Sequence, residues 1–314
     1  YPVTPGIVPL LERERPDVVV ASGWSTFASQ AAIAWCRVRR VPYVLVVESH
    51  DRDPRPGWRR AVKQAVVPRV VGGAASILVT GSLARESMLA RGARPDRVYL
   101  FANTVDVELF AARHRELEHE RPRLREALGL DPDDVVVLSV ARLVPEKGLD
   151  TLIRAAAAAG SPIALLLAGA GPERERLVAL AGSLRVQLVL AGDVDWRRIH
   201  ELYAAADVFA LLSRHEPWGV VVNEAAAAGL PLVLSENVGA AADLLRHGEN
   251  GFLVAADDSA AAARALAMLA ADPARRATAG SASTRIAASW GYQPSVDAFV
   301  AAVQTAASSV RCSD

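Results

Sequence analysis

Short apolar runs alternate with longer helix-compatible segments along the whole chain, and this alternation most constrains the fold. The apolar runs are rich in Val, Leu and Ile, as is typical of strands that are buried on both faces. Parallel strands need a crossover connection, usually a helix, and the intervening segments are long enough to form one. The pattern therefore predicts an α/β protein whose parallel sheets are covered by helices on both faces.

The predicted strands fall into a group of four and a group of six. They are Asp17–Ser22, Tyr43–Ser49, Ser76–Thr80 and Val98–Ala102, followed by Val135–Val140, Ile163–Ala168, Val186–Ala191, Val208–Ser213, Leu232–Ser235 and Phe252–Val254. The helices predicted between them include Phe27–Arg39, Leu83–Arg91, Leu149–Ala159, Glu173–Ala181 and Trp196–Ala206. Six strands are enough for a complete doubly wound sheet, whereas the first group begins abruptly after a proline-rich start.

A segment dense in charged residues, Ala111–Arg125, separates the two groups. Because it has few apolar positions, we interpret it as a solvated linker or an exposed helix, and its His114 and His119 as solvated residues. A chain of 314 residues is long enough for two hydrophobic cores. We therefore predict a first domain over residues 1–118 and a second domain over residues 119–290.

Composition excludes several classes of function. Lys plus Arg and Asp plus Glu both number 35, so no overall field attracts nucleic acid or an anionic membrane. Cys36 and Cys312 lie too far apart in the sequence to indicate a disulfide framework or a metal site, which fits a reducing cytoplasm. No apolar run approaches the ~18 residues that span a bilayer, so only peripheral membrane contact remains open.

Two glutamates, Glu216 and Glu224, stand out after the predicted strand Val208–Ser213. Glu216 lies in a polar loop with a Pro-Trp-Gly turn, and Glu224 lies in the helix-compatible run that follows. Such a strand–loop–helix unit places its loop at the carboxyl edge of a parallel sheet, where ligands bind. Both carboxylates can then face one crevice, although either alone could be an ordinary surface charge.

The pattern Glu-Pro-Trp-Gly-x-x-x-Asn-Glu-Ala over residues 216–225 resembles the signature of retaining glycosyltransferase family 4. The resemblance covers nearly the whole chain, about residues 15–290. It implies the GT-B fold, with two Rossmann-like doubly wound domains facing a cleft and a last helix, residues 291–314, crossing back to the first domain. It also implies retaining transfer of a sugar from a nucleotide-sugar without a metal or another cofactor.

The resemblance assigns roles to the residues of this stretch. Donor-sugar hydroxyls are expected on Glu216 and ribose hydroxyls on Glu224. Pro217, Trp218 and Gly219 are expected to offer backbone groups to the sugar. No carboxylate stands out as a covalent nucleophile, so we favour attack on the same face of the sugar as the departing phosphate.

Two cations, Arg142 and Lys147, lie in a loop between the predicted strand Val135–Val140 and the helix that begins at Leu149. An Arg fork and a Lys charge at a helix N-terminus would stabilise the negative charge that develops on a departing pyrophosphate. A cationic loop is also a common surface feature. The resemblance implies phosphate contacts by both residues.

Three further turns are candidates for contact with the nucleotide. Gly171 lies in a glycine turn that lacks the third glycine of a dinucleotide fingerprint, because Arg174 occupies that position, so a nicotinamide enzyme is disfavoured. By resemblance, Gly171 approaches the nucleotide and Val194 the base, unless both are ordinary tight turns. Gly239 matches a family position that usually has two adjacent glycines, the second being Ala240 here.

The first half carries less signal. His50 follows a predicted strand and resembles a histidine that relatives place near the reacting sugar carbon, although it could be an ordinary loop residue. The stretch Asn103–Asp106 resembles the Asn-Gly-Val-Asp segment that closes the first domain of the family. The first few strands of that domain, with their glycine-rich loop, have no counterpart in this chain.

Several alternatives stay open. The chain is expected to be an active transferase, a fragment of a longer one, or a catalytically weak nucleotide-sugar-binding or partner subunit. Because of the missing strands, we expect it to bind a nucleotide-sugar but to transfer sugar poorly. A sugar epimerase or phosphorylase on the same fold is a third class, although nothing indicates a lysine for pyridoxal phosphate. The sequence does not decide between a UDP-, GDP- or ADP-sugar donor, or between a glycan, lipid or small-molecule acceptor.

Overall fold

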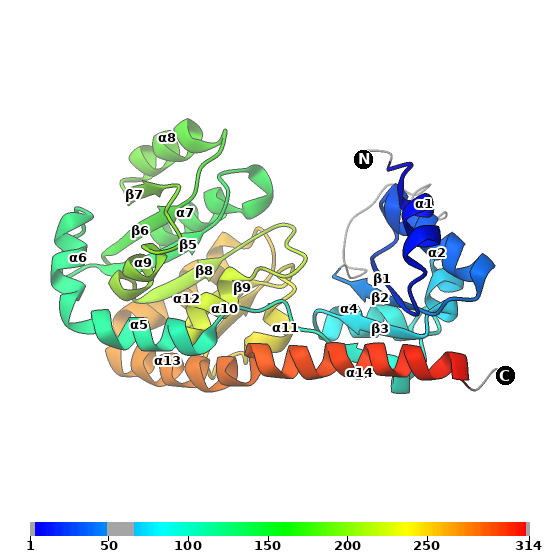
Figure 1. The fold of residues 1–314 in the computed structure, drawn as a ribbon. Helices are drawn as coiled ribbons and strands as arrows, with labels where there is room; N and C mark the ends of the chain where they lie inside the picture. The colour runs from blue at the N-terminus through cyan, green and yellow to red at the C-terminus, as the bar shows by residue number, and fades with distance from the viewer. Residues whose placement is uncertain (1–3, 49–65, 312–314) are drawn as a thin grey trace. The chain divides into compact units, whose positions relative to one another are not determined.

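The computed structural model describes residues 4–48 and 66–311, and it divides the chain into two compact units. The first unit comprises Tyr1–Asn103 and Tyr292–Asp314, and the second comprises Thr104–Gly291. Both units contain a parallel sheet with helical crossovers (Figure 1). The predicted α/β class is therefore confirmed.

The second unit contains a six-stranded parallel sheet in the order β10-β9-β8-β5-β6-β7. The strands are β5 (Val135–Val140), β6 (Ile163–Ala168), β7 (Gln187–Gly192), β8 (Val208–Leu211), β9 (Leu232–Ser235) and β10 (Gly251–Val254). The helices are α5 (Val107–Leu117), α6 (Arg121–Ala127), α7 (Leu149–Ala158), α8 (Arg174–Leu184), α9 (Ile199–Ala205), α10 (Val221–Ala227), α11 (Ala241–Leu244), α12 (Ser259–Ala271) and α13 (Pro273–Ala287). The strand order reverses between β5 and β8, which is the point where doubly wound sheets form ligand crevices.

Alternating residues of the strands in this sheet enter two separate cores. In β5, Val136 and Leu138 pack with α5, α9 and α10, whereas Val135 and Val137 pack with α7 and α12. Helices therefore cover both faces of the sheet, as the continuous apolar runs predict (Figure 1). This double cover fixes the positions of the loops at the carboxyl edge.

The first unit contains a four-stranded parallel sheet in the order β1-β2-β3-β4. Its elements are α1 (Ile7–Glu14), β1 (Val19–Ser22), α2 (Phe27–Arg39), β2 (Tyr43–Val47), β3 (Ser76–Val79), α4 (Ser82–Leu89), the short 3₁₀ helix η1 (Pro95–Arg97), β4 (Val98–Leu100) and α14 (Tyr292–Arg311). One face of the sheet packs with α2 and a helical segment over residues 66–73. On the other face, Ala302 and Ala306 of α14 pack against Val44 and Leu78.

The charged segment is helical, as the second of its two interpretations predicts, but it belongs to the second unit and does not separate the two units. Residues 107–127 form α5, the 3₁₀ turn η2 (Glu118–Glu120) and α6, and the second unit begins at Thr104 and not near residue 119. Val107 and Phe110 are buried in the core of the second unit, which explains the earlier boundary. The sequence pattern also missed α1, because Pro5 lies just before this helix and Pro9 lies in its first turn, where prolines read as a loop; Leu11 of the helix is buried.

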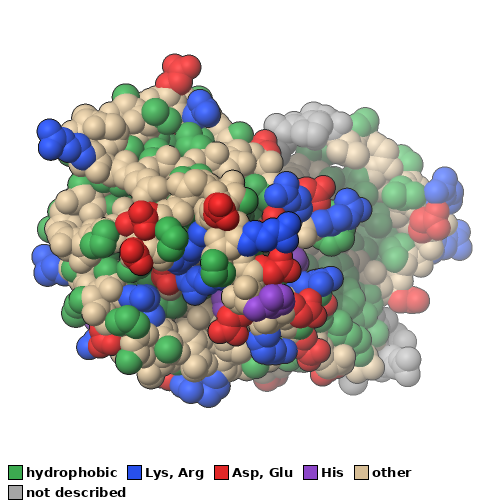
Figure 2. Space-filling model, turned by 90° about the vertical axis from the view of Figure 1, so that its left-hand side faces the viewer, with side chains coloured by type: hydrophobic (Ala, Val, Ile, Leu, Met, Phe, Trp, Pro, Cys, Tyr) green, Lys and Arg blue, Asp and Glu red, His purple; other side chains and the backbone are tan. Residues whose placement is uncertain are grey.

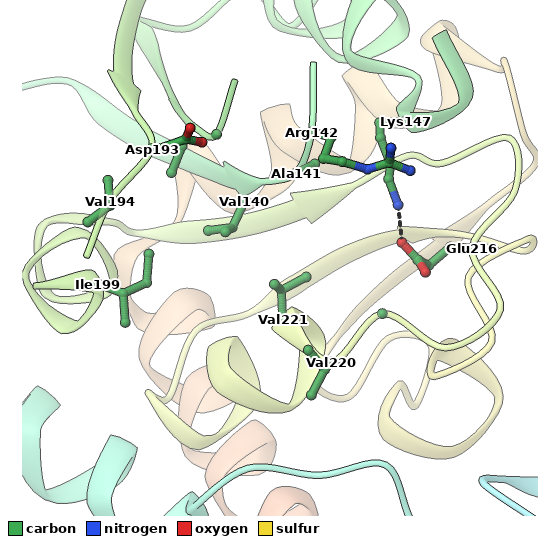
Figure 3. Close-up of a pocket in the computed structure, with 13 residues that line it drawn as sticks. Val140, Ala141, Arg142, Lys147, Asp193, Val194, Ile199, Glu216, Val220 and Val221 are labelled. Carbon is green, nitrogen blue, oxygen red and sulfur yellow. Dashed lines mark hydrogen bonds and ion pairs between the residues drawn. The ribbon is translucent and has the colours of Figure 1, made fainter. Parts of the chain in front are cut away.

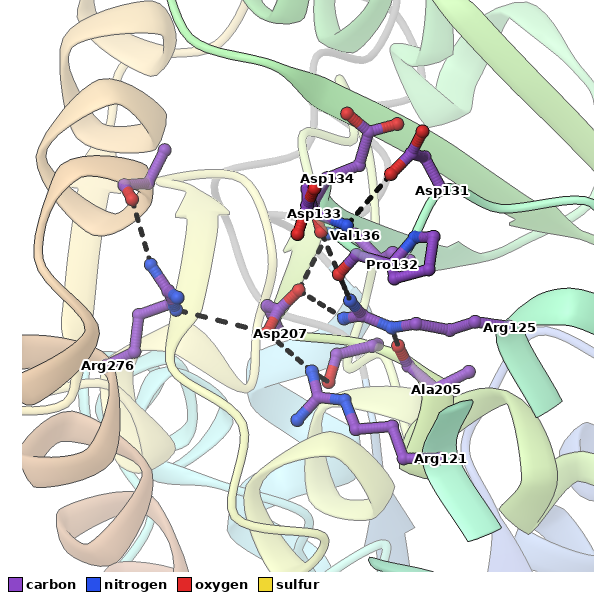
Figure 4. Close-up of polar contacts among 12 residues, drawn as sticks. Arg121, Arg125, Asp131, Pro132, Asp133, Asp134, Val136, Ala205, Asp207 and Arg276 are labelled. Carbon is purple, nitrogen blue, oxygen red and sulfur yellow. Dashed lines mark hydrogen bonds and ion pairs between the residues drawn. The ribbon is translucent and has the colours of Figure 1, made fainter. Parts of the chain in front are cut away.

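Arg125 in this segment is 7% exposed and binds the carboxylate of Asp207, which lies just before β8 (Figure 4). The Arg125 Nη2–Asp207 Oδ2 distance is 2.5 Å, and Arg121 pairs with the other carboxylate oxygen. The backbone N–H of Val136 also donates to Asp207 Oδ2 at 2.8 Å. These contacts fix α6 to the amino ends of β5 and β8, so a segment rich in charge is part of the folded unit.

Charges elsewhere on the second unit are mixed. On the face that Figure 2 presents, Lys and Arg side chains are interspersed with Asp and Glu side chains. This distribution agrees with the equal numbers of the two signs in the sequence. Within the part of the chain that the structure describes, we find no helix with the length and apolar character needed to cross a bilayer.

Candidate functional site

A cavity of about 400 Å³ lies at the carboxyl edge of the second sheet, at the reversal between β5 and β8 (Figure 3). Its lining comes from the loops that follow β5, β6, β7 and β8. Three of the predicted site residues with charged side chains, Arg142, Lys147 and Glu216, line it together. A parallel sheet brings these residues to one edge although up to 74 positions separate them in the sequence.

The central polar contact of the cavity is an ion pair between Lys147 Nζ and Glu216 Oε2 (Figure 3). Both side chains are largely buried, with 14% and 16% of their surface exposed. Arg142 lies beside this pair and forms no ion pair or hydrogen bond through its side chain within residues 4–48 and 66–311. At this end of the cavity one carboxylate faces two cations, and this local excess of positive charge favours an anionic group of a ligand.

Glycine at position 148 allows Lys147 to reach Glu216. Gly148 has a φ of +61°, and a Cβ atom there would lie 2.1 Å from the carbonyl oxygen of Leu212. Lys147 ends the short 3₁₀ helix η3 (Pro145–Lys147), and α7 begins directly after the glycine. The loop after β5 thus approaches the residue after β8 so closely that a side chain at position 148 would clash with it.

The Glu216 loop is held on its other side by the segment that follows β9. The N–H of Glu216 donates to the carbonyl of Asn237 at 3.2 Å, and the N–H of Gly239 donates to the carbonyl of Glu216 at 3.0 Å. A Cβ at Gly239 would lie 2.0 Å from the carbonyl oxygen of Pro217. Gly239 therefore supports the loop by close packing, and it is not part of the cavity wall.

The other end of the cavity is mostly apolar. Val140, Val194, Ile199 and Val221 line it, together with the carboxylate of Asp193 (Figure 3). Val194 was predicted at this position from the turn after β7, whereas Asp193 and Ile199 were not singled out. Their only sequence signal is their position beside that turn. The cavity is thus divided into an ionic end and an apolar end.

The remaining predicted residues lie around the cavity without lining it. Gly171 packs against the carbonyl of Leu143, and Pro217 is exposed beside Glu216. The Trp218 side chain is 4% exposed in the core and donates from Nε1 to Asn223 Oδ1 at 3.0 Å. Gly219 does line the cavity, whereas His50 lies outside the described residues.

Glu224 lies one turn below the cavity rim on α10 and is absent from its lining. Its Oε2 atom accepts a hydrogen bond from the hydroxyl of Tyr203 at 2.6 Å. Burial raises the pKa of the Glu224 carboxyl, and the hydrogen bond from Tyr203 lowers it by a smaller amount. The sequence pattern missed Tyr203, because a buried tyrosine on an apolar helix is usually only a core residue.

Comparison with known proteins agrees with the topology of the chain. Residues 120–285 match the model of the family described as glycosyl transferases group 1, and residues 2–104 match a glycosyl transferase 4-like domain. The chain belongs to the glycosyl transferases group 1. The family resemblance inferred from residues 216–225 is therefore confirmed.

Relatives in this family include two D-inositol 3-phosphate glycosyltransferases. The protein from Rhodococcus opacus is 32% identical over 264 residues, which cover 79% of this chain and 56% of the relative. The protein from Catenulispora acidiphila is 31% identical over 320 residues, covering 92% and 72%. The chain spans about half the length of several of the curated relatives that it matches.

Solved structures with the same fold include Anabaena HepE in complex with UDP. The TM-score is 0.76 at 22% identity, and the match covers 98% of this chain and 82% of HepE. Sucrose-phosphate synthase from Thermosynechococcus elongatus gives a TM-score of 0.74 at 23% identity, covering 95% and 75%. These similarities show the GT-B fold that the sequence analysis predicted.

Proposed function

We propose that this glycosyl transferase transfers a sugar from a nucleotide-sugar donor with retention of configuration and without a divalent metal. The observation that carries the proposal is the cavity at the strand-order reversal, where Arg142, Lys147 and Glu216 meet. Every residue that lines it belongs to the second unit. Donor binding is therefore proposed for the second unit alone.

The division of the cavity supports one orientation of the donor. The diphosphate lies at the ionic end, where Arg142 and Lys147 supply fixed positive charge. The base lies at the apolar end between Val194, Ile199 and Val140, and the sugar lies beside Glu216. Lys147 has three N–H donors, so it can bind Glu216 and a phosphate oxygen at the same time.

The proposed reaction needs no residue that forms a covalent intermediate. The bond from the sugar C1 to the β-phosphate oxygen breaks, and a bond from C1 to the acceptor hydroxyl oxygen forms on the same face. The acceptor proton moves to the departing phosphate oxygen, which acts as the base. Arg142 and Lys147 stabilise the charge on the nucleoside diphosphate as it leaves.

The names of related proteins direct the choice of donor and acceptor. HepE has been crystallised with UDP and with UDP-glucose, and the relatives from Rhodococcus and Catenulispora are named for transfer to D-inositol 3-phosphate. We therefore propose a UDP-sugar as donor and a hydroxyl-rich small molecule as acceptor. Inositol 3-phosphate is the first acceptor to test.

The proposal is tested by proton NMR of a reaction with UDP-glucose, UDP-N-acetylglucosamine, GDP-mannose or ADP-glucose and inositol 3-phosphate. A thermal-shift panel with UDP, GDP and ADP first selects the base, since a ligand that binds only the native state raises the melting temperature. We expect an α-configured product from an α-configured donor, at the same rate with EDTA or Mg²⁺. A β-configured product would contradict retention, and loss of activity with EDTA would contradict the metal-free mechanism.

The partner-subunit alternative predicts a different outcome in the same experiment. A nucleoside diphosphate would bind and raise the melting temperature, but no donor would be consumed beyond the rate without protein. Arg154→Ala is the matched control for Arg142 and Lys147, because Arg154 is an exposed arginine on α7 that does not line the cavity. Absence of any nucleotide-dependent thermal shift would contradict both readings.

A further inference from the structure

A second cavity lies in the first unit and takes no part in the proposed donor site. Its volume is about 460 Å³, against about 400 Å³ for the cavity of the second unit. It is lined at the start of β2 by Val41, Pro42 and Tyr43, and just before β3 by residues 72–75. It therefore lies at the amino edge of the first sheet, whereas the loops that follow β2 and β3 lie at the carboxyl edge.

Three arginines from two separate elements line this cavity. Arg37 and Arg40 come from the C-terminal end of α2, and Arg97 ends η1, just before β4. Within the described parts of the chain, the side chains of all three form no hydrogen bond and no ion pair. Three cations around one cavity repel one another unless an anion lies between them.

The neighbouring arginines show that acidic partners are available locally. Arg39 pairs with Glu12 at 2.7 Å, and Arg94 pairs with Asp96 at 2.7 Å. The arginines with acidic partners thus alternate with arginines that line the cavity. Arg37 and Arg40 also complement the helix dipole at the end of α2, but such a contribution is small at exposed positions and does not explain Arg97.

The rest of the lining favours binding over chemistry. The Tyr43 hydroxyl donates to the carbonyl of Val70 at 2.5 Å, and the Cys36 side chain is 0% exposed. Burial raises the pKa of the Cys36 thiol to about 11, so it is not a thiolate at neutral pH. Val41, Pro42 and Ala74 provide an apolar wall beside the arginines.

We propose that this cavity is a second binding site, in which Arg37, Arg40 and Arg97 bind the phosphate or diphosphate group of a ligand distinct from the donor. Guanidinium groups bind phosphate oxygens through paired N–H donors, and a cluster of them is a recurring phosphate site. The cavity is large enough for a phosphorylated small molecule or a phospholipid headgroup. The proposal does not depend on the function assigned to the second unit.

Inorganic pyrophosphate is the probe, titrated by calorimetry at low ionic strength. The starting protein is the Arg142→Ala/Lys147→Ala variant, which removes the cations of the donor cavity. We expect one pyrophosphate to bind it, and the additional pair Arg40→Ala/Arg97→Ala to weaken that binding at least tenfold. The side chains of Arg40 and Arg97 form no hydrogen bond or ion pair within the described residues. The melting temperature of the variant that lacks both should therefore lie within a few degrees of that of the starting protein.

The matched control is Arg15→Ala/Arg85→Ala, which removes two other arginines of the first unit. Arg15 ends α1 in the same left-handed conformation that Arg40 adopts at the end of α2 (φ of 47° and 58°). This control should bind pyrophosphate as the starting protein does. An equal loss of pyrophosphate affinity in the control and the test variant would contradict a specific site. The proposal would also be contradicted if the starting protein bound neither pyrophosphate nor vesicles that contain phosphatidic acid.

Sedimentation with vesicles distinguishes the two sources of phosphate. If the ligand is a lipid headgroup, the protein should co-sediment with vesicles of phosphatidylcholine and phosphatidic acid. It should not co-sediment with vesicles of phosphatidylcholine alone. The Arg40→Ala/Arg97→Ala pair should then stay in solution. Saturation by pyrophosphate without sedimentation would identify a soluble ligand.

Discussion

The hydroxyl of Tyr203, a side chain only 1% exposed, donates a hydrogen bond to Oε2 of Glu224 at 2.6 Å. No cation pairs with Glu224 within the described residues, so this hydroxyl is the main group that stabilises its ionised form. Desolvation nevertheless dominates and raises the pKa of the carboxyl. The ionised carboxylate therefore costs stability, as is common for groups kept for binding.

A pH-dependent stability difference follows for Glu224→Gln. A carboxyl whose pKa is raised in the folded state stabilises the fold below its unfolded pKa, and this contribution is lost as pH rises through the folded pKa. The glutamine variant keeps an acceptor for Tyr203 but does not ionise. Its melting temperature should match that of the parent near pH 4 and exceed it increasingly toward pH 7, as calorimetry would show. A difference that does not change with pH would contradict this account.

The two glutamates should separate in ligand binding. Glu224→Ala should weaken both the free nucleoside diphosphate and the donor, because the ribose is common to both ligands. Glu216→Ala should weaken the donor and slow transfer while changing diphosphate affinity little. Loss of a hydrogen bond to a charged group costs ~1.5–3 kcal/mol, or tenfold and more in affinity.

Isothermal titration of both variants with the selected diphosphate tests this division of roles. Glu175→Ala is the control, since Glu175 is exposed on α8 and does not line the cavity. Equal diphosphate affinities in Glu216→Ala and Glu224→Ala would rule out separate sugar and ribose contacts. Glu224 does not line the cavity, so the predicted loss of diphosphate affinity in Glu224→Ala is the stricter test of the two.

Asp207→Ala should destabilise the second unit strongly. Removing this carboxylate leaves Arg125 buried without its anionic partner and the N–H of Val136 without its acceptor. Breaking a buried ion pair from one side costs ~3–5 kcal/mol, which urea unfolding would measure. Asp133→Ala, at an exposed position of the loop before β5, should change stability by less than about 0.5 kcal/mol.

Gly239→Ala should displace the Glu216 loop by a steric clash. The added methyl group would lie 2.0 Å from the carbonyl oxygen of Pro217, so the loop has to move. We expect a stability loss of ~1–3 kcal/mol and weaker donor binding. Gly182→Ala on α8 meets no atom within 4 Å and serves as the control. Unchanged donor binding in Gly239→Ala would show that Glu216 is not held by this contact.

The sequence predicts most of the fold because buried parallel strands leave an unmistakable apolar pattern. The bounds of β5, β6 and β9 agree with prediction to the residue. The inclusion of the charged segment in the second unit was not predicted, since composition does not show that Arg125 and Asp207, 82 positions apart, pair with each other. Helix α1 was missed because Pro9 lies in its first turn and Leu11 is its buried residue, so its sequence lacks a clear apolar period.

The candidate site, like the fold, was predicted only in part. The family resemblance implied that Arg142, Lys147, Glu216 and Val194 contact one donor, and each of them follows a strand of one parallel sheet. It did not predict the Lys147–Glu216 ion pair, which depends on how closely Gly148 lets two loops approach. It also placed Gly171, Pro217 and Gly239 at the ligand, whereas they pack beside the cavity wall. Side-chain direction and loop contacts depend on packing that no local pattern encodes.

The central claim is that the cavity of the second unit binds a nucleoside diphosphate through Arg142 and Lys147. Calorimetric titration of UDP, or of the diphosphate that the thermal-shift panel selects, into Arg142→Ala/Lys147→Ala tests it most directly. Loss of two charge-assisted contacts at ~1.5–3 kcal/mol each predicts affinity at least a hundredfold weaker, with Arg154→Ala unchanged. Equal affinity in the parent and a correctly folded double variant would contradict the claim.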